Sequence, residues 1–237
     1  MEIIKFDTLG LDPKILRAIT EMGFEEPSPI QAKAIPEVMA GHDVIGQAQT
    51  GTGKTAAFGI PLLQKIDPKN RKLQAIILCP TRELAIQVAD EIRNLAKYMH
   101  GIKILPIYGG QDIVRQIRGL KDGTQIIIGT PGRMNDHLSK QNFDADTVTT
   151  LVIDEFDKCL EFGFQEEMAT VIGQLPNLQR RFLLSATDAE EIPQFTGLDK
   201  TIKLNFLNPE EQLTHRLHLY KVLSPEKDKL ETLYKLL

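Results

Sequence analysis

Residues Val44–Ala56, with the sequence VIGQAQTGTGKTA, determine how the rest of the chain is interpreted. The stretch opens with the strand-like run Val44–Gly46, and a helix is expected from about Ala56. Between them, glycines let the backbone turn tightly, so that successive N–H groups face inward and form a nest for phosphate oxygens. The amino terminus of the following helix adds partial positive charge. The stretch therefore predicts a phosphate-binding loop between a strand and a helix.

Within this loop, Lys54 is expected to reach the β- and γ-phosphates of a nucleotide, and the Thr55 hydroxyl to hold Mg²⁺. The strict pattern has glycine where Ala48 stands, but Gly53-Lys54-Thr55 and the strand–turn–helix setting carry the function. The alternative is a glycine-rich loop that merely precedes a helix, and the Lys-Thr pair argues against it. The predicted nucleotide contacts of the loop are Gln49, Thr50, Gly51, Thr52, Gly53, Lys54 and Thr55.

Short β-branched runs alternate with longer amphipathic stretches along the chain, clearest in the helical pattern at Glu83–Tyr98. Several runs are almost continuously apolar, as in strands that are covered on both faces. We therefore predict an α/β fold with a mostly parallel sheet and helices on both faces, with ligands bound at the carboxyl ends of the strands. The predicted strands are Asp43–Gly46, Ala75–Cys79, Lys103–Ile107, Gln125–Ile128, Thr150–Ile153, Arg181–Leu184 and Ile202–Leu204.

An acidic pair follows one of these strands, where a Mg²⁺ site would need a second ligand. After Leu151-Val152-Ile153, Asp154 is placed for the metal shell, and Glu155 to accept a proton from, or orient, an attacking water. The alternative is an acidic helix start, since carboxylates are favoured there. Beside a phosphate-binding loop we favour the catalytic interpretation, with Lys54, Asp154 and Glu155 as catalytic residues and Thr55 and Asp154 as metal ligands.

The composition of the chain narrows the classes of protein to which it can belong. The 237-residue chain is 42% apolar and 25% charged, as in ordinary globular proteins, with no apolar run long enough to cross a bilayer. Met1–Asp7 lacks a secretory start, and Cys79 and Cys159 are expected to be buried, reduced thiols, so we expect a cytoplasmic protein. The net charge of −4 leans against a broad basic surface, so nucleic-acid binding must depend on locally placed residues.

The order of short motifs resembles the DEAD-box RNA helicases of superfamily two over residues 6 to about 204. Phe6 together with Gly23–Gln31 is similar to the family's Q motif, and Ala48–Thr55 to its first motif. The resemblance implies a RecA-like P-loop NTPase domain that uses ATP and Mg²⁺. It also implies that Gln31 reads the adenine edge, with aromatic support from Phe24.

Other segments are similar to the family's RNA-contacting and coupling motifs. Each also has a local explanation, because Thr81 and Thr130 suit helix N-caps and Pro131 a first helical position. These motifs occur together, in the family's order, and each lies at the carboxyl end of a predicted strand. Helix capping does not explain that combination. The implied RNA contacts, made to the backbone, are Pro80, Thr81, Arg82, Gly109, Gly110, Thr130, Pro131, Gly132 and Arg133. Asp157, Ser185 and Thr187 are the implied residues that couple hydrolysis to strand separation.

One residue departs from the family pattern. Asp154-Glu155-Phe156-Asp157 has Phe where the family has Ala, so the surroundings must make room for a larger side chain. The link between Asp157 and Ser185 or Thr187 is the feature that this change puts in question.

The expected organisation is a helical segment over residues 1–41 with helices at Leu11–Met22 and Ile30–Met39, then a RecA-like domain over 42–204. A linker is expected at 205–212, and a truncated start of a second domain at 213–237, with a strand at Leu213–Leu223 and a helix at Lys227–Leu237. Because the resemblance assigns catalytic arginines to a second domain, we expect the chain to bind nucleotide as a monomer with little hydrolysis or unwinding.

The leading hypothesis is therefore the ATP-binding domain of an RNA helicase. The alternatives are a DNA helicase or translocase of the same superfamily and a regulatory ATP-binding module. The pairing of Phe6 with Gln31 favours RNA, and the intact Glu155 argues against a purely regulatory role. The physiological RNA and any protein partners stay open.

Overall fold

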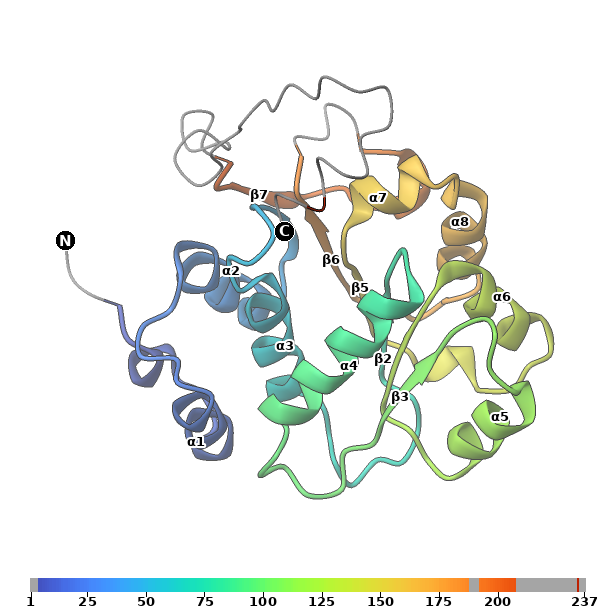
Figure 1. Ribbon diagram of the computed structural model, residues 1–237, viewed down its shortest axis with the longest axis horizontal. Helices are drawn as coiled ribbons and strands as arrows, with labels where there is room; N and C mark the ends of the chain where they lie inside the picture. Colours follow the sequence, from blue (N-terminus) through green and yellow to red (C-terminus); the bar gives the residue numbers. More distant parts are fainter. Residues whose placement is uncertain (1–3, 188–191, 208–233, 235–237) are drawn as a thin grey trace. The chain divides into compact units, whose positions relative to one another are not determined.

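A single sheet of seven parallel strands forms the centre of the molecule in the computed structural model, which describes residues 4–187, 192–207 and 234 (Figure 1). The predicted α/β class is confirmed, and every strand pair is parallel. All seven predicted strands are present, with ends that differ from the prediction by at most one residue. In chain order they are β1 (Asp43–Gln47), β2 (Ala75–Leu78), β3 (Ile104–Ile107), β4 (Ile126–Gly129), β5 (Thr150–Ile153), β6 (Arg180–Ser185) and β7 (Thr201–Asn205).

The strands lie in the order β3-β4-β2-β5-β6-β1-β7. In a parallel sheet all carboxyl ends meet at one edge, so the segments that follow the strands are gathered there. The chain divides into two units after Leu207. The strand predicted at Leu213–Leu223, the helix at Lys227–Leu237 and most of the predicted linker lie outside the described residues.

Eight α-helices are present in the described part of the chain, and the helices predicted within that part are among them with shifted ends. Asp12 caps the first helix and its side chain accepts a hydrogen bond from the Lys14 backbone N–H, so this helix begins at Pro13. The helices are α1 (Pro13–Glu21), α2 (Pro29–Ala40), α3 (Lys54–Lys65), α4 (Arg82–Leu95), α5 (Ile113–Lys121), α6 (Pro131–Ser139), α7 (Phe156–Glu161) and α8 (Gln165–Gly173).

Successive strand residues point to opposite faces, and each face has its own core. On β2, Ile77 packs with helices α2, α3 and α4, whereas Ile76 and Leu78 pack with α6, α7 and α8. Both faces of the sheet are therefore covered, and this explains why the strands are almost continuously apolar. Cys79 and Cys159 are buried and free, as expected.

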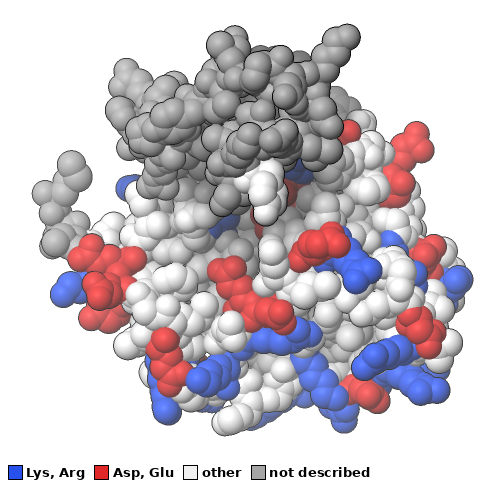
Figure 2. Space-filling model, viewed as in Figure 1, with Lys and Arg blue, Asp and Glu red and all other residues white. Residues whose placement is uncertain are grey.

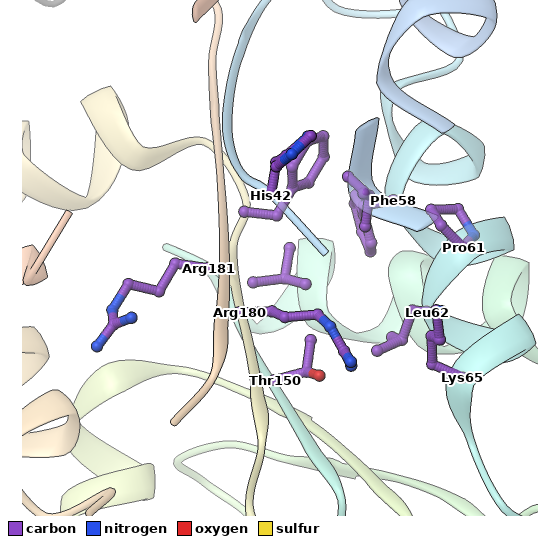
Figure 3. A pocket seen from close by; sticks show the side chains of 11 residues that line it. His42, Phe58, Pro61, Leu62, Lys65, Thr150, Arg180 and Arg181 are labelled. Atoms are coloured by element: carbon purple, nitrogen blue, oxygen red, sulfur yellow. The ribbon is translucent and has the colours of Figure 1, made fainter. Parts of the chain in front are cut away.

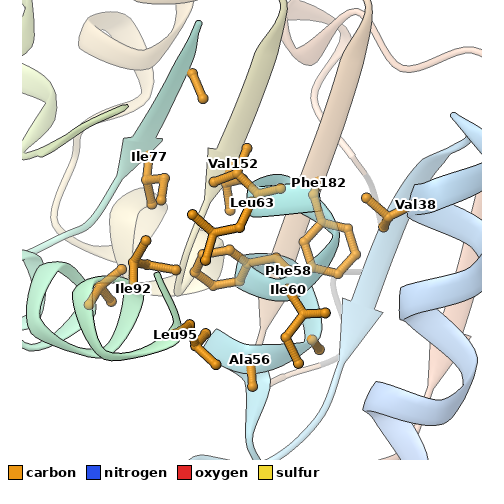
Figure 4. Packing of buried hydrophobic residues seen from close by; sticks show 14 of the residues in the cluster. Val38, Ala56, Phe58, Ile60, Leu63, Ile77, Ile92, Leu95, Val152 and Phe182 are labelled. Carbon is orange, nitrogen blue, oxygen red and sulfur yellow. The ribbon is translucent and has the colours of Figure 1, made fainter. Parts of the chain in front are cut away.

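Helix α3, which follows the phosphate-binding loop, lies at the centre of the larger core (Figure 4). Gly59 faces α4 so closely that a Cβ there would lie 2.4 Å from Ile92 Cδ1. Phe58 packs against Phe182 of β6, with ring centroids 6.2 Å apart. These contacts fix the helix, and with it the loop, relative to the sheet.

A small cavity lies at the amino ends of the strands, where His42, Lys65 and Arg180 surround apolar side chains (Figure 3). Its volume of about 10 Å³ is the space of one water molecule. The predicted site residues lie at the opposite edge, so this cavity is a packing feature. Among the described residues, no helix combines the length and apolar character needed to cross a bilayer.

A glycine at the end of β4 tests how tightly the sheet edge is packed. A Cβ on Gly129 would lie 2.3 Å from the Ile107 backbone oxygen of β3, so Gly129→Ala must push the two strands apart. We expect the free energy of unfolding in urea to fall by about 1–3 kcal/mol. Gly173→Ala is the control, because nothing lies within 4 Å of a Cβ at that position. The control should be neutral or slightly stabilising, and equal effects would contradict this account.

Candidate functional site

A cavity of about 320 Å³ lies at the carboxyl edge of the sheet, and five of the residues predicted to bind nucleotide line it: Thr50, Gly51, Gly53, Lys54 and Thr55. The phosphate-binding loop and the acidic pair, far apart in sequence, both line this cavity. Helix α4 forms another wall. The lining residues are Thr50, Gly51, Gly53, Lys54, Thr55, Leu84, Gln87, Val88, Glu91, Asp154 and Glu155.

The phosphate-binding loop is held by hydrogen bonds to α2. Ser28 Oγ donates to the Thr52 carbonyl oxygen over 2.8 Å, and Gln31 Nε2 donates to the Gly53 carbonyl oxygen over 3.1 Å. Gly51 and Gly53 both have a φ of 82°, which favours glycine. A Cβ on Gly53 would lie 2.3 Å from Gln31 Nε2, so close packing also requires glycine there.

Lys54 begins α3 and is buried, with 7% of its surface exposed. Its Nζ has no hydrogen-bond partner within the part of the chain that the structure describes. A buried ammonium without hydrogen bonds is unfavourable, and buried polar groups nearly always have partners. The residues present therefore fit an anionic ligand whose oxygens accept from this ammonium.

Asp154 follows β5 and is 3% exposed. Burial raises the pKa of its carboxyl group to about 6, while the Lys54 charge opposes the rise. Its Oδ1 accepts a hydrogen bond of 3.0 Å from the Glu155 backbone N–H. A buried carboxylate beside a threonine hydroxyl is an oxygen-donor set of the kind that Mg²⁺ prefers.

Glu155 adopts a left-handed backbone conformation, with φ 49° and ψ 53°. A non-glycine residue in this region carries strain of order 1–3 kcal/mol, and such residues cluster at functional sites. The strained turn lets Asp154 and Glu155 both line the cavity.

Of the predicted adenine-binding residues, Gln31 is bonded to the loop, and Phe6 and Phe24 lie next to each other. The Phe6 and Phe24 ring centroids are 6.4 Å apart, and Phe6 is buried. Gln31 is buried, and its Oε1 accepts from the Ser28 backbone N–H over 2.9 Å. Together with its bond to Gly53, this leaves Gln31 one amide hydrogen to offer, and adenine recognition by Gln31 stays a prediction.

Gln87 and Glu91 of α4 line the cavity and were not predicted. Burial raises the pKa of the Glu91 carboxyl group, and a hydrogen bond with the Thr55 side chain opposes this rise. Both residues lie next to the apolar stripe that contains Leu84 and Val88. Their four-residue spacing places them on one side of the helix, but only the packing of α4 beside α3 turns that side toward the loop.

The predicted coupling residues are joined across β5 and β6. Thr187 Oγ1 donates to Asp157 Oδ2 over 2.9 Å, and the Ala186 backbone N–H donates to the same oxygen over 3.2 Å. Phe156 is 2% exposed, and its ring lies 6.5 Å from that of Phe195. The larger side chain therefore points into the core and leaves the Asp157–Thr187 bond intact.

The segments predicted to contact RNA occupy the other half of the same edge. They follow β3, β4 and β2, which are neighbours in the sheet, whereas the nucleotide-site and coupling segments follow β5, β6 and β1. Arg82, Gly109, Gly110 and Gly132 are exposed. Thr81 caps α4, and its side chain accepts from the Leu84 backbone N–H over 3.2 Å. Thr130 is the N-cap of α6 but makes no side-chain capping bond, which leaves its hydroxyl free of that role.

Three neighbouring residues differ from these in exposure. Pro80 and Pro131 are buried, and Arg133 is half-buried with its Nε 3.6 Å from Asp136 Oδ2. The two prolines are therefore placed to shape the loops rather than to present side chains.

A phosphate-binding loop, an acidic pair after a neighbouring strand and an all-parallel sheet define a P-loop nucleotide-binding protein of the RecA-like α/β class. The DEAD/DEAH box helicase family model matches residues 28–195, and the chain belongs to this family.

Known proteins similar to this chain include bacterial RNA helicases. The chain is 44% identical over 237 residues to the ATP-dependent RNA helicase CshA of Listeria monocytogenes, an alignment that covers 98% of this chain and 45% of that protein. It is 48% identical over 191 residues to the ATP-dependent RNA helicase DeaD of Klebsiella pneumoniae, covering 81% and 30%. The chain thus spans less than half the length of each relative.

The fold is similar to that of a DEAD box protein from Methanococcus jannaschii, with a TM-score of 0.81 and 39% identity. That match covers 86% of this chain and 56% of the other.

The raised pKa of Asp154 predicts how stability depends on pH without metal or nucleotide. The folded protein holds this proton more tightly than the unfolded chain, so its stabilising effect is complete below about pH 4 and is lost as the pH rises through about 6. At pH 7.5, Asp154→Asn should raise the free energy of unfolding in EDTA by on the order of 1–3 kcal/mol, with a smaller gain at pH 5. Urea unfolding at both pH values checks this. Asp199→Asn, at an exposed position, should show no such difference; a pH-independent gain for Asp154→Asn would contradict the assignment.

Proposed function

We propose that this chain is the ATP-binding domain of an ATP-dependent RNA helicase, which hydrolyses ATP in response to RNA and separates short duplexes. The observation that carries the proposal is the single cavity shared by Lys54, Thr55, Asp154 and Glu155. The bacterial relatives, which are ATP-dependent RNA helicases, support it.

In this proposal the loop N–H groups and Lys54 bind the phosphates of ATP. Thr55 and Asp154 are the residues that would hold Mg²⁺, with Glu91 beside Thr55. When bound, Mg²⁺ supplies positive charge to phosphate oxygens as negative charge develops on them. The buried position of Asp154 keeps water from screening that charge.

Glu155 is the proposed base. Its carboxylate lines the cavity beside the phosphate-binding loop, where it can orient water and accept its proton. Asp154-Glu155-Phe156-Asp157 then takes the place of the family's name-giving motif. The Asp157–Thr187 hydrogen bond joins this motif to the end of β6, and is the proposed link between nucleotide state and RNA.

Adenine is proposed to bind near Gln31, with Phe24 and Phe6 as its apolar support. Since the bond from Gln31 to Gly53 also holds the phosphate-binding loop, base recognition and phosphate binding are mechanically joined.

RNA is proposed to bind across the ends of β2, β4 and β3. Backbone N–H groups at Gly109 and Gly110, the amino termini of α4 and α6, and the charge of Arg82 suit phosphates rather than bases. In Figure 2, basic and acidic side chains are intermixed on the visible face, without a broad basic region. Because the proposed contacts are made to phosphates, little sequence preference is expected.

Replacing Lys54 tests the nucleotide site. Lys54→Ala should weaken binding of a Mg²⁺–ATP analogue by about 10- to 100-fold, because a charge-assisted contact worth roughly 1.5–3 kcal/mol is lost. Isothermal titration calorimetry measures this. Lys65→Ala, at the far end of α3, is the matched control and should leave affinity unchanged. Equal affinities of Lys54→Ala and the unaltered chain would refute the site.

The choice of nucleic acid can be tested separately. ATP turnover of the protein containing this chain should rise with single-stranded RNA and much less with DNA of the same sequence, because RNA is distinguished by its 2′-hydroxyls. A phosphate-release assay compares the two. Stimulation by DNA alone would favour a DNA translocase, and turnover unaffected by Glu155→Gln would favour a regulatory module.

A further inference from the structure

A chain of hydrogen-bonded side chains, buried at Tyr108, Gln116 and His137, begins next to the Gly109-Gly110 turn. Gln111 Nε2 donates to Tyr108 Oη over 2.6 Å, and Gln116 Nε2 donates to the Tyr108 carbonyl oxygen over 3.1 Å and to Gln111 Oε1 over 3.2 Å. Gln116 Oε1 then lies 2.9 Å from His137 Nε2, and His137 Nδ1 lies 3.0 Å from Asn142 Nδ2. The network runs from the turn through α5 to the end of α6.

The hydrogen-bond pattern assigns the tautomer of His137. Gln116 Nε2 is used as a donor twice, so Gln116 Oε1 is the acceptor facing the imidazole and His137 Nε2 carries the hydrogen. Nδ1 then accepts from the Asn142 amide. Burial is the main cause that lowers the pKa of His137, which agrees with a neutral ring satisfied on both nitrogens.

Both central residues are deeply buried, Gln116 at 2% and His137 at 0% exposure. The pair also satisfies other polar groups, because Gln116 Nε2 donates to the Tyr108 carbonyl oxygen and His137 Nδ1 accepts from the Asn142 amide. What a satisfied polar network adds is a unique arrangement, because each donor and acceptor accepts only one geometry.

The network joins two loops that already lie side by side. The turn at Gly109 follows β3, and the segment at Thr130 follows the adjacent β4. The Thr130 backbone N–H donates to the Ile107 carbonyl oxygen over 3.3 Å, which fixes the loops at their base. Gln116 of α5 and His137 of α6 join the two helices that follow these loops.

The segment that follows β2 also contacts Tyr108. The Arg82 guanidinium lies over the Tyr108 ring, 5.4 Å from its centroid. A Cβ on Gly110 would lie 3.7 Å from Arg82 Nη1. Tyr108 thus links the segments that follow β2 and β3, and the Gln116–His137 contact extends this link to the helix that follows β4.

We infer that Gln116 and His137 are positioning residues for RNA: their buried contact holds the Gly109-Gly110 turn and the amino terminus of α6 at the spacing that lets both bind one RNA backbone. This inference rests on the proposed function. Neither residue contacts RNA in this proposal, because both side chains are buried beneath the loops.

The test replaces both partners of the Gln116–His137 contact with apolar side chains; the Tyr108 carbonyl oxygen and the Asn142 amide lose their bonds to the pair in the same variant. Gln116→Leu/His137→Leu should bind a fluorescent single-stranded RNA about tenfold more weakly, the loss of roughly one charge-assisted phosphate contact. Affinity for a Mg²⁺–ATP analogue should stay within about twofold, because the nucleotide site follows other strands. Amide hydrogen exchange at Gly109 and Gly110 should become faster.

Two matched variants separate positioning from loss of stability. Val171→Ala removes volume from the core beneath α6 and α8 without touching the network, and should leave RNA affinity unchanged despite lower stability. His137→Gln keeps an N–H able to reach Gln116 Oε1, and should restore most of the RNA affinity lost in His137→Leu.

The outcomes are distinguishable. Unchanged RNA affinity in the double variant, or an equal loss in Val171→Ala, would overturn the positioning role. If the unaltered protein binds no RNA, the proposed function fails instead. In that case, unchanged exchange at Gly109 and Gly110 in the double variant would separately overturn the claim that the network holds the turn.

Discussion

A buried ammonium and a buried carboxylate that share one cavity without bonding to each other are the arrangement on which this structure depends. Lys54 Nζ has no hydrogen-bond partner in the described residues, and Asp154 is almost completely enclosed. Each charge is costly to bury, and their mutual attraction offsets only part of that cost. The raised pKa of Asp154, which burial increases and Lys54 opposes, expresses the same balance. The site is therefore poised for a ligand that brings negative oxygens to Lys54 and a cation to Asp154.

Because of the strand order, the nucleotide cavity and the proposed RNA-binding region lie at different strands of the same sheet edge. β5, β6 and β1 end at the nucleotide cavity, and β2, β4 and β3 end at the proposed RNA-binding edge. β2 and β5 are neighbours, so the two halves meet at the centre of the sheet. The hydrogen bond between Asp157 and Thr187 ties the acidic motif to the end of β6. In the proposed function, this packed centre connects the nucleotide cavity to the proposed RNA-binding edge.

Buried polar side chains hold both halves in place. In the nucleotide half, Gln31 occupies the space that a Cβ on Gly53 would need, and bonds to the loop carbonyl. In the other half, Gln116 and His137 hold the loops that follow β3 and β4. Both devices use buried amides, which accept only a narrow range of geometries, to fix loops that would otherwise move independently.

The sequence by itself determined the elements and the chemistry of the site. Strands such as Thr150–Ile153 are short apolar runs covered on both faces, and Gly53-Lys54-Thr55 requires a glycine turn before a helix, so local residue types were sufficient. Only the tertiary structure decided which segments meet. It placed β1 between β6 and β7, turned Glu91 toward Thr55, buried Phe156 against Phe195 and paired Gln116 with His137. These are contacts between residues distant in sequence, and local periodicity shows which side of an element is apolar but not which neighbour will cover it.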